Sequence, residues 1–261
     1  MTAGEENKVQ DRKVAVVTGA GQGLGQATAI ALAATGMDIA LVGRTRAKLE
    51  ATAAMVSGRT EIVVADLGDG DQVAAAFQHV MESMGRVDVL INNAAIYNPF
   101  RLDSASNDQI ESMIANSFTA PVFCMREAIN CIRAGRRGGD IVNVTSQSIQ
   151  MPQPYMAVYS AAKAAVDTMS RGLRTELRGE PFRITNFSVG VIESENSHKI
   201  WTSREFMEEV TGAFVKSGVA PFFTSPGSSP ESLANTIVHI VTAAADICLE
   251  QVDARGSHPT G

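Results

Sequence analysis

The chain has 261 residues, of which 45% are hydrophobic, a net charge of −6 and a pI near 5.3. This acidic balance disfavours nucleic acid and anionic membranes as partners. The sequence has no apolar run as long as a membrane span and no signal-peptide core in its polar start, so we expect a cytoplasmic protein. The three cysteines and four histidines are scattered, which predicts neither a disulfide framework nor a metal site.

The first predicted element is a strand over residues 13–18 that runs into a cluster of glycines, with an alanine-rich helix at 27–35 behind it. Strand, glycine turn and helix in this order predict a dinucleotide-binding loop. Gly19 would allow the sharp turn, Gly23 would let the backbone approach a pyrophosphate, and Gly25 would let the helix pack on the strand. The loop residues expected to bind the cofactor are Gly19, Gln22, Gly23, Leu24 and Gly25.

Strands and helices alternate along the rest of the chain. Further strands are predicted at 38–42, 61–65, 87–91, 140–145, 183–188 and 247–252, and helices at 46–56, 72–84, 109–134, 158–178 and 231–244. This alternation predicts an α/β fold, a Rossmann-type doubly wound and mainly parallel sheet of seven strands with helices on both faces. We expect a flexible tail at 1–11 and a single domain over 12–261.

The tip of the second strand bears on the choice of nicotinamide cofactor. No carboxylate follows Gly43 to accept the ribose hydroxyls of NAD, whereas Arg44 offers a planar fork suited to the 2′-phosphate of NADP. Thr45 can add a hydroxyl and Arg46 a further positive field. Gln22 argues the other way, because it brings no positive charge to the glycine loop. The pattern favours NADP(H), with NAD(H) as the alternative if both arginines are only solvated residues at a helix start.

A hydroxyl, a phenol and an ammonium are spaced to meet at one place further along the chain. Ser146 closes a β-branched run that reads as a buried parallel strand, so it would lie at a carboxyl strand end, where open α/β sheets bind ligands. Tyr159 and Lys163 are one turn apart on the same face of the helix predicted after it. Together the three groups suit proton transfer to a ketone oxygen.

These motifs resemble the short-chain dehydrogenase/reductase family over about residues 13–194. The matching positions are Thr18, Gly19, Gly23 and Gly25 for the glycine motif, Asp66 and Leu67 for the adenine contact, Asn92, Asn93, Ala94 and Ala95 for the Asn-Asn-Ala-Gly motif, and Asn116, Ser146, Tyr159 and Lys163 for the catalytic residues. Ala95 replaces the last glycine of its motif.

The resemblance implies an oxidoreductase that transfers hydride between NAD(P)(H) and a ketone or secondary alcohol. Tyr159 would act as general acid and base, and Ser146 would orient the substrate oxygen. Lys163 would bind the nicotinamide ribose and, together with the oxidised nicotinamide, lower the pKa of Tyr159 by up to about three units. Asn116 would hold a water that links Lys163 to solvent.

The resemblance also assigns residues around the cofactor and the substrate. Further cofactor contacts are expected at Arg44, Thr45, Asp66, Leu67, Asn93, Ala94, Ala95, Tyr159, Lys163, Gly190, Ile192 and Ser194. Val189 replaces the usual Pro before Gly190, which weakens the expectation for the carboxamide contact. Residues 193–230 would form a substrate lid with a helix at 203–215. The expected substrate pocket consists of Ile96, Tyr97, Gln147, Met151, Tyr155, Val191 and Trp201.

Relatives pair through the two long helices, so we expect a homodimer or homotetramer. The apolar surplus on the first of them supports this interpretation: Met113, Ile114, Phe118, Phe123, Cys124, Ile129 and Ile132. The alternative function is a catalytically silent nucleotide-binding or scaffold protein of the same fold, although such proteins lack Tyr or Lys from the trio. An epimerase or dehydratase of the extended branch would need a larger carboxyl-terminal domain.

Overall fold

A computed structural model describes residues 12–193, 203–218 and 227–256. Its centre is one parallel sheet of seven strands in the order β3-β2-β1-β4-β5-β6-β7. The strands are β1 (Val14–Thr18), β2 (Asp38–Gly43), β3 (Thr60–Val64), β4 (Val89–Asn92), β5 (Gly139–Ser146), β6 (Phe182–Val189) and β7 (Gln251–Ala254). The predicted doubly wound α/β fold is confirmed.

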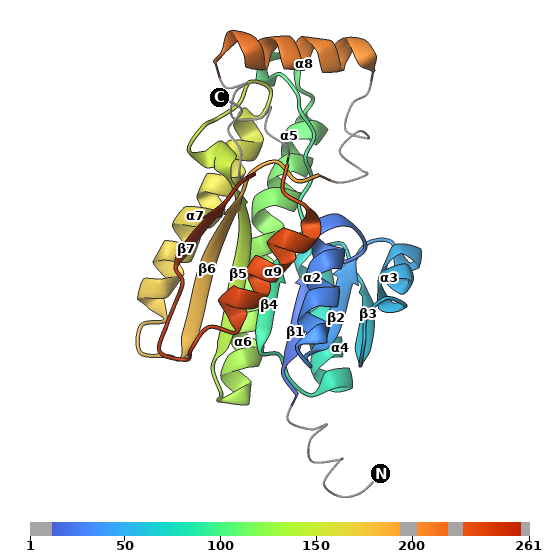
Figure 1. The fold of residues 1–261 in the computed structure, drawn as a ribbon, viewed down its shortest axis with the longest axis vertical. Helices are drawn as coiled ribbons and strands as arrows, with labels where there is room; N and C mark the ends of the chain where they lie inside the picture. The colour runs from blue at the N-terminus through green and yellow to red at the C-terminus, as the bar shows by residue number, and fades with distance from the viewer. Residues whose placement is uncertain (1–11, 194–202, 219–226, 257–261) are drawn as a thin grey trace, which may run out of the picture.

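Helices cover both faces of the sheet (Figure 1). They are α2 (Gly23–Ala34), α3 (Arg46–Ala53), α4 (Gly70–Met84), α5 (Asn107–Ile114), α6 (Ala120–Gly135), α7 (Ala157–Glu176), α8 (Arg204–Lys216) and α9 (Pro230–Val241). Helices α2, α3 and α9 pack their apolar side chains on one face, and α4, α6 and α7 pack on the other. The strands are buried on both sides for this reason, and β1 is buried at every position. Helix α8 lies across the end of the molecule at which the strands finish.

The long helix predicted at 109–134 is present over residues 107–135, but it is not α-helical throughout. A π-helical turn, η2 (Ala115–Thr119), separates α5 from α6. Pro121 lies in the first turn of α6 and has no N–H to donate, so the α-helical ladder cannot continue through it. The backbone N–H of Ala120 instead reaches back to the carbonyl of Ala115. Asn116 therefore lies in the irregular turn rather than in a regular helix.

The last strand also differs from its prediction at 247–252, because β7 begins only at Gln251. The residues before it form a turn in which the N–H of Ile247 donates to the carbonyl of Ala244 over 2.9 Å. The guanidinium of Arg183 donates to the carbonyls of Ala243, Ala244 and Ile247 at 3.0–3.3 Å. Ile247 is 47% exposed, so the first part of the apolar run serves as a connection and not as sheet.

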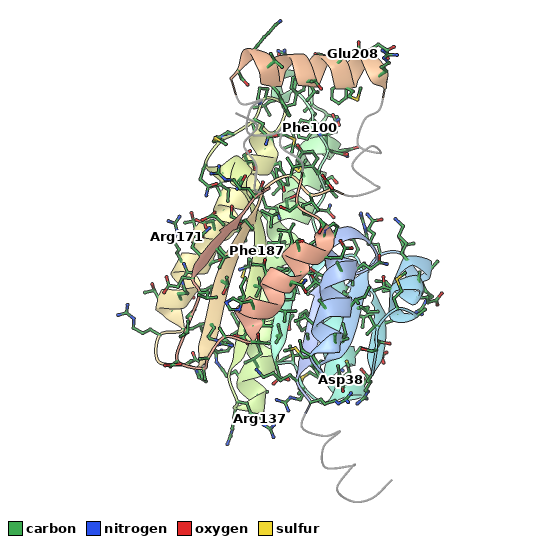
Figure 2. The ribbon with its side chains drawn as sticks, viewed as in Figure 1. Asp38, Phe100, Arg137, Arg171, Phe187 and Glu208 are labelled. Atoms are coloured by element: carbon green, nitrogen blue, oxygen red, sulfur yellow. The ribbon has the colours of Figure 1, made fainter. Side chains whose placement is uncertain are left out.

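The amino edge of the sheet is closed by buried ion pairs. Asp38, Asp88 and Asp140 stand at or near the starts of β2, β4 and β5, and each is at most 5% exposed. Their carboxylates meet Arg12, Arg86 and Arg183 in turn. The Arg183–Asp140 pair is two-pronged, with nitrogen–oxygen distances of 2.5 and 3.0 Å. Figure 2 shows Asp38 at this end of the molecule and Glu208 of α8 at the opposite end.

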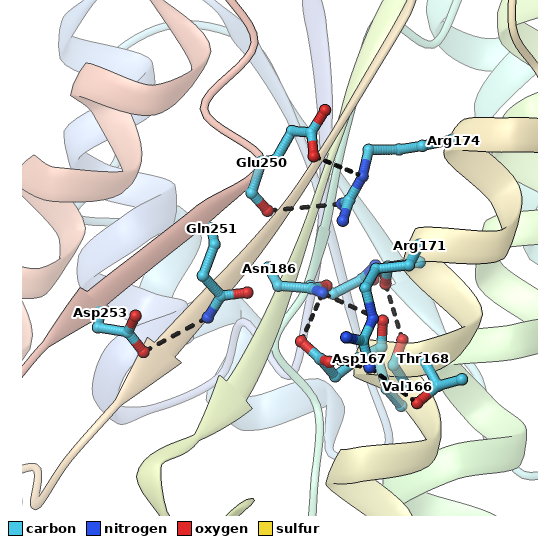
Figure 3. Close-up of polar contacts among 11 residues, drawn as sticks. Val166, Asp167, Thr168, Arg171, Arg174, Asn186, Glu250, Gln251 and Asp253 are labelled. Carbon is cyan, nitrogen blue, oxygen red and sulfur yellow. Dashed lines mark hydrogen bonds and ion pairs between the residues drawn. The ribbon is translucent and has the colours of Figure 1, made fainter. Parts of the chain in front are cut away.

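Polar contacts join α7 to the last two strands (Figure 3). The Asn186 amide on β6 donates to the Asp167 carboxylate over 2.8 Å, and Arg171 pairs with the same carboxylate over 3.0 Å. Arg174 pairs with Glu250, just before β7, over 3.4 Å. These bonds hold α7, which carries two of the expected catalytic residues, against the sheet.

In the described part of the chain, no helix combines the length and apolar character that crossing a membrane requires.

Candidate active site

A cavity of about 400 Å³ opens at the carboxyl edge of the sheet, beside the glycine loop. Its wall includes Gly19, Gln22, Gly23, Leu24, Arg44, Thr45, Asp66, Leu67, Asn93, Ala94, Ala95, Ile96, Asn116 and Ile192. Most of the residues expected at the cofactor thus line one hollow. Gly25 lies just beneath it, and Gly190 lies beside Gln147. Ser194 lies outside the described residues.

The glycine loop has the geometry that close backbone approach needs. Gly19 and Gly23 adopt φ of +65° and +55°, which other residues avoid. A Cβ on Gly25 would lie 2.3 Å from the carbonyl oxygen of Gly19, so a larger residue would push α2 off the loop. Helix α2 starts at the cavity with no acidic residue in its first turn and no side-chain cap from Gln22. Its free N–H groups and positive dipole end fit a pyrophosphate, so the residues present fit a dinucleotide.

Two side chains, those of Thr18 and Asn93, hold the loop against the end of β4. The Thr18 hydroxyl donates to the carbonyl of Ile91 over 3.1 Å and accepts from the backbone N–H groups of Asn93 and Ala94, both over 3.0 Å. The Asn93 amide donates to the Thr18 carbonyl over 2.9 Å. The threonine of the glycine motif and the second asparagine of the Asn-Asn-Ala stretch therefore fix the floor of the cavity together.

The rim of the cavity at the tip of β2 carries a residue that the sequence reasoning missed. Lys48 of α3 lines the cavity with Arg44 and Thr45, and its ammonium donates to the Gln22 side chain over 2.6 Å. Arg46 is absent from the cavity wall and pairs with Glu50 over 3.9 Å. The signal for Lys48 was its place in the first turn of the helix after β2, since a side chain there can reach back over the loop.

The three catalytic candidates meet above the end of β5. Ser146 is its last residue, and its hydroxyl lies near enough to the phenol of Tyr159 to act on the pKa of that phenol. The same Ser146 oxygen accepts from the N–H of Ser148 over 3.2 Å. Lys163 is 2% exposed and donates to the carbonyl of Val144 over 2.8 Å. Its nitrogen lies 5.9 Å from the centre of the Tyr159 ring, so the spacing in the sequence does bring hydroxyl, phenol and ammonium together.

Burial dominates the acid–base properties of this cluster. It raises the pKa of Tyr159 to about 12, while the nearby Ser146 hydroxyl acts in the opposite direction. Burial also lowers the pKa of Lys163 to about 8. In the protein as described, desolvation of the phenolate holds the pKa of Tyr159 above its ordinary value, and the expected lowering, which counted the charge of Lys163, stays a prediction. That expectation also counted a positive charge on the cofactor.

Asn116 faces the cofactor cavity from the π-helical turn. Its side-chain nitrogen donates to the carbonyl of Ser112 over 2.9 Å, so its side-chain oxygen is the atom left to accept a hydrogen bond. The sequence placed Asn116 at the site by its family motif, and the cavity wall includes it. The turn in which it lies was not predicted.

The expected substrate side of the site has two tyrosines. The Tyr97 ring packs edge-on against Tyr159, with ring centres 5.4 Å apart, and its hydroxyl donates to Gln153 over 3.4 Å. The Tyr155 hydroxyl donates to Glu209 of α8 over 2.5 Å. Gln153 and Glu209 were not predicted, since neither belongs to a motif.

The remaining pocket candidates are spread around these tyrosines. Ile96 lines the cofactor cavity, Met151 is half-buried and Val191 is 38% exposed. A Cβ on Gly190 would lie 2.9 Å from the Gln147 amide oxygen, so these two residues are adjacent. Trp201 lies outside the described residues.

The ends of the predicted lid are joined. Ile192 and Ser228 form a parallel bridge, and the N–H of Glu193 donates to the Ser228 carbonyl over 3.0 Å. Helix α8 contacts the body of the protein at Tyr155, whose ring also packs edge-on against Phe206 with centres 5.9 Å apart. Parts of the lid, 194–202 and 219–226, lie outside the described residues.

The sheet, the glycine loop and the cavity define a dinucleotide-binding protein of the Rossmann type. Comparisons with known proteins agree. The family model described as short chain dehydrogenase matches residues 13–205. Galactitol 2-dehydrogenase of Agrobacterium fabrum is 26% identical over 242 residues, which are 92% of this chain and 94% of that protein. The 3-oxoacyl-acyl-carrier-protein reductase of Synechocystis sp. is 31% identical over 193 residues, 72% of this chain and 77% of that one.

A solved structure has the same fold. An alcohol dehydrogenase from the archaeon Thermococcus sibiricus, complexed with 5-hydroxy-NADP, aligns with a TM-score of 0.78 over 95% of this chain and 97% of that one, at 22% identity. The chain therefore belongs to the short-chain dehydrogenase family, and it is an oxidoreductase that acts on alcohols or ketones with a nicotinamide cofactor.

Proposed function

We propose that the protein reduces a ketone with NADPH and, in reverse, oxidises the matching secondary alcohol, with Tyr159 as general acid and base. The observation that carries the proposal is the cluster at the end of β5, where Ser146 ends the strand and the buried Lys163 ammonium lies 5.9 Å from the centre of the Tyr159 ring. Ser146 accepts from the Ser148 backbone, and its one proton would turn to the substrate oxygen when a ketone binds. Two hydroxyl donors then converge on one acceptor atom.

The protonation states suit this role. In reduction, the substrate oxygen takes the proton of Tyr159, whose pKa of about 12 keeps the phenol protonated at neutral pH. Lys163, with a pKa of about 8, stays mostly charged at pH 7. The nicotinamide, when bound, supplies or accepts the hydride. In the oxidation direction the pKa of Tyr159 must fall, which a positive charge on the cofactor, added to that of Lys163, favours.

Asn116 completes the proposed proton route. Asn116 lines the cavity from the π-helical turn, and its side-chain oxygen would hold a water there. Such a water would resupply a proton to Lys163 after each turnover. The proposed cofactor contacts are those residues of the cavity wall that the family motifs assign, together with Gly25, Gly190 and Ser194.

The preference for NADPH rests on the tip of β2. Arg44 and Thr45 line the cavity at the strand end, and no acidic residue stands between Gly43 and Arg46 to repel a 2′-phosphate. Asp66 lies in the same wall, at the position that the family uses for adenine. NAD(H) stays the alternative cofactor.

Replacing the proposed proton donor tests the function. We expect Tyr159→Phe to lower turnover of a responsive ketone by 10²–10⁴-fold, because that is the usual cost of losing a general acid. The panel includes 3-oxo esters, keto sugars and cyclic ketones, chosen from the names of the relatives. NADPH binding, followed by fluorescence, should stay near the wild-type value. A variant with more than about a tenth of wild-type turnover would exclude Tyr159 as the donor, and a wild type inactive on every ketone would favour the silent nucleotide-binding alternative.

We also propose a homodimer or homotetramer in the cytoplasm. Fewer apolar side chains are left for an interface than the sequence indicated. Four of those named above are buried inside the protomer: Met113, Cys124, Ile129 and Ile132. Ile114 is 41% exposed on α5 and supports an interface there. Light scattering at micromolar concentration tests the assembly, and a stable monomer would contradict it.

A further inference from the structure

Lys48 brings a positive charge to the glycine loop from a different element. It is exposed in the first turn of α3, where a cation opposes the helix dipole and gains nothing for the helix. Its ammonium lies 2.6 Å from the side-chain oxygen of Gln22. Gln22 immediately precedes Gly23, the first residue of α2. The Lys48 ammonium therefore brings a positive charge to the place in the glycine loop that the neutral Gln22 occupies.

The partner of Lys48 leaves its charge intact. The Gln22 amide is neutral, so the bond orients the ammonium without cancelling its field. Arg46, only two positions away, pairs instead with the carboxylate of Glu50 and is absent from the cavity wall. Of these two neighbouring cations, only Lys48 faces the cavity, and it does so together with Arg44.

The loop is shaped to accept the lysine stem. A Cβ on Gly21 would lie 2.9 Å from the Cβ of Lys48, so a side chain at Gly21 would displace Lys48. Gly21 leaves room for the Lys48 stem, and the bond to Gln22 fixes the ammonium before a ligand binds. A lysine ordered in advance loses less conformational entropy on binding than a free one.

We propose that Lys48 is a specificity-determining residue that binds the 2′-phosphate of NADPH together with Arg44. This inference rests on the proposed preference for NADPH. A ribose 2′-phosphate carries about two negative charges at neutral pH, and two cations on one rim of the cavity match them. Gln22 is then a positioning residue, since it orients Lys48 and needs no contact with the phosphate.

Binding of cofactor fragments tests the proposal without relying on activity. The probes are 2′,5′-ADP, which carries the 2′-phosphate, and 5′-AMP, which lacks it; dissociation constants are measured by calorimetry on wild type, Lys48→Gln, Lys48→Arg and the matched control Arg46→Gln. We expect Lys48→Gln to weaken 2′,5′-ADP about tenfold and to leave 5′-AMP unchanged, because only one probe loses a charge-assisted bond. Lys48→Arg should keep most of the affinity, and Arg46→Gln should behave as wild type.

The outcomes separate this inference from the cofactor preference itself. Unchanged 2′,5′-ADP binding in Lys48→Gln, with a clear loss in Arg44→Ala, would overturn the role of Lys48 and keep the preference for NADPH. An equal loss for both probes would assign Lys48 to the 5′-phosphate side and also overturn the proposal. A wild type that binds 2′,5′-ADP no better than 5′-AMP would overturn both the preference and the inference. Gly21→Ala, which displaces Lys48, should reproduce the loss seen in Lys48→Gln.

Discussion

The two edges of the sheet treat buried polar groups in opposite ways. At the amino edge, Asp38, Asp88 and Asp140 are each buried and each paired with an arginine. At the carboxyl edge, burial raises the pKa of Tyr159 and lowers the pKa of Lys163, so it favours the neutral form of each side chain. The first edge is arranged for stability, and the second holds groups whose ionisation is costly.

In the part of the chain that the structure describes, several buried hydroxyl groups near the catalytic candidates have no hydrogen-bond partner, unlike the paired carboxylates of the amino edge. Among the described residues, buried hydroxyls without a hydrogen-bond partner include those of Thr145, Ser148, Ser160 and Ser188. Thr145 and Ser148 flank Ser146, Ser160 follows Tyr159, and Ser188 is in register with Thr145. Unsatisfied buried groups lower stability and gather at functional sites in many proteins. Substitutions at the two edges should therefore change the free energy of unfolding in opposite directions.

Breaking a pair at the amino edge should have the largest effect on stability. Arg183→Met removes the two-pronged partner of Asp140 and four hydrogen bonds that two of its nitrogens donate to carbonyls after and at the end of α9. We expect a loss of about 3–5 kcal/mol in the free energy of unfolding, because a buried carboxylate is left alone. Urea denaturation measures it. Arg171→Met is the control, since that pair is exposed and worth about 1 kcal/mol or less. Equal losses in both variants would contradict the role given to the amino edge.

At the carboxyl edge, Lys163→Met should make the protein more stable at pH 7. The folded state lowers the pKa of Lys163 from 10.5 to about 8, which costs roughly 3 kcal/mol while the group is protonated. Lys163→Met removes this cost but also removes the hydrogen bond to Val144, which lowers stability by about 1 kcal/mol. We therefore expect the free energy of unfolding to rise by about 2 kcal/mol. Catalysis should be lost at the same time.

The stability of the wild-type protein should depend on pH through Lys163. Between about pH 8 and 10.5 the unfolded lysine binds more protons than the folded one, so wild-type stability should rise with pH in this window. The raised pKa of Tyr159, about 12, acts in the opposite direction only above its ordinary value of about 10. Urea midpoints from pH 7 to 9.5 measure the slope. If Lys163→Met has the same slope as wild type, Lys163 is not the group responsible.

A smaller effect is expected at the rim of the cofactor cavity. Arg44→Ala should weaken NADPH about tenfold and leave NADH nearly unchanged, because NADH has no phosphate there to lose. The ratio of kcat/KM with the two cofactors measures it. Gly43→Asp should shift the ratio further by repulsion, although its Cβ would lie 3.3 Å from Leu49, so Leu49 must move slightly. An unmoved ratio in Arg44→Ala would restore the interpretation of Arg44 as a solvated helix-start residue.

The smallest effect is expected where the predicted lid helix meets the body. Tyr155→Phe removes the hydrogen bond to Glu209 but keeps the ring beside Phe206. We expect KM for a responsive ketone to rise about fivefold with little change in kcat, because a hydrogen bond that holds α8 to the body is lost. Glu209→Gln should move KM less, since an amide oxygen still accepts. Wild-type kinetics in Tyr155→Phe would show that this bond does not affect substrate binding.

Features that depend on local pattern could be predicted from the sequence. The buried β-branched strands, the glycine turn and the alternation of strands and helices gave the sheet, and family spacing gave Ser146, Tyr159 and Lys163. Features that depend on side-chain reach could not. Lys48 reaches Gln22 across two elements, and Glu209 meets Tyr155 from 54 positions away.

The features that the sequence reasoning missed have readable physical causes. Pro121 was present in the predicted long helix, and its missing N–H explains the π-helical turn before it. The pKa of Tyr159 in the protein without cofactor could not be predicted from charge alone, because desolvation depends on packing and packing depends on the fold. The start of β7 depends on the guanidinium of Arg183, a residue of another strand.

The π-helical turn at Ala115–Thr119 implies that the helix carries one inserted residue. A π turn absorbs an extra residue while the segments on either side stay in phase. Deleting one residue from this turn should therefore restore a continuous α-helix, with α5 and α6 still packed as before, and rotate Asn116 away from the cavity wall. The fold would then survive without this asparagine at the site, so the extra residue of the turn serves to present Asn116 and not to support the packing of α5 and α6.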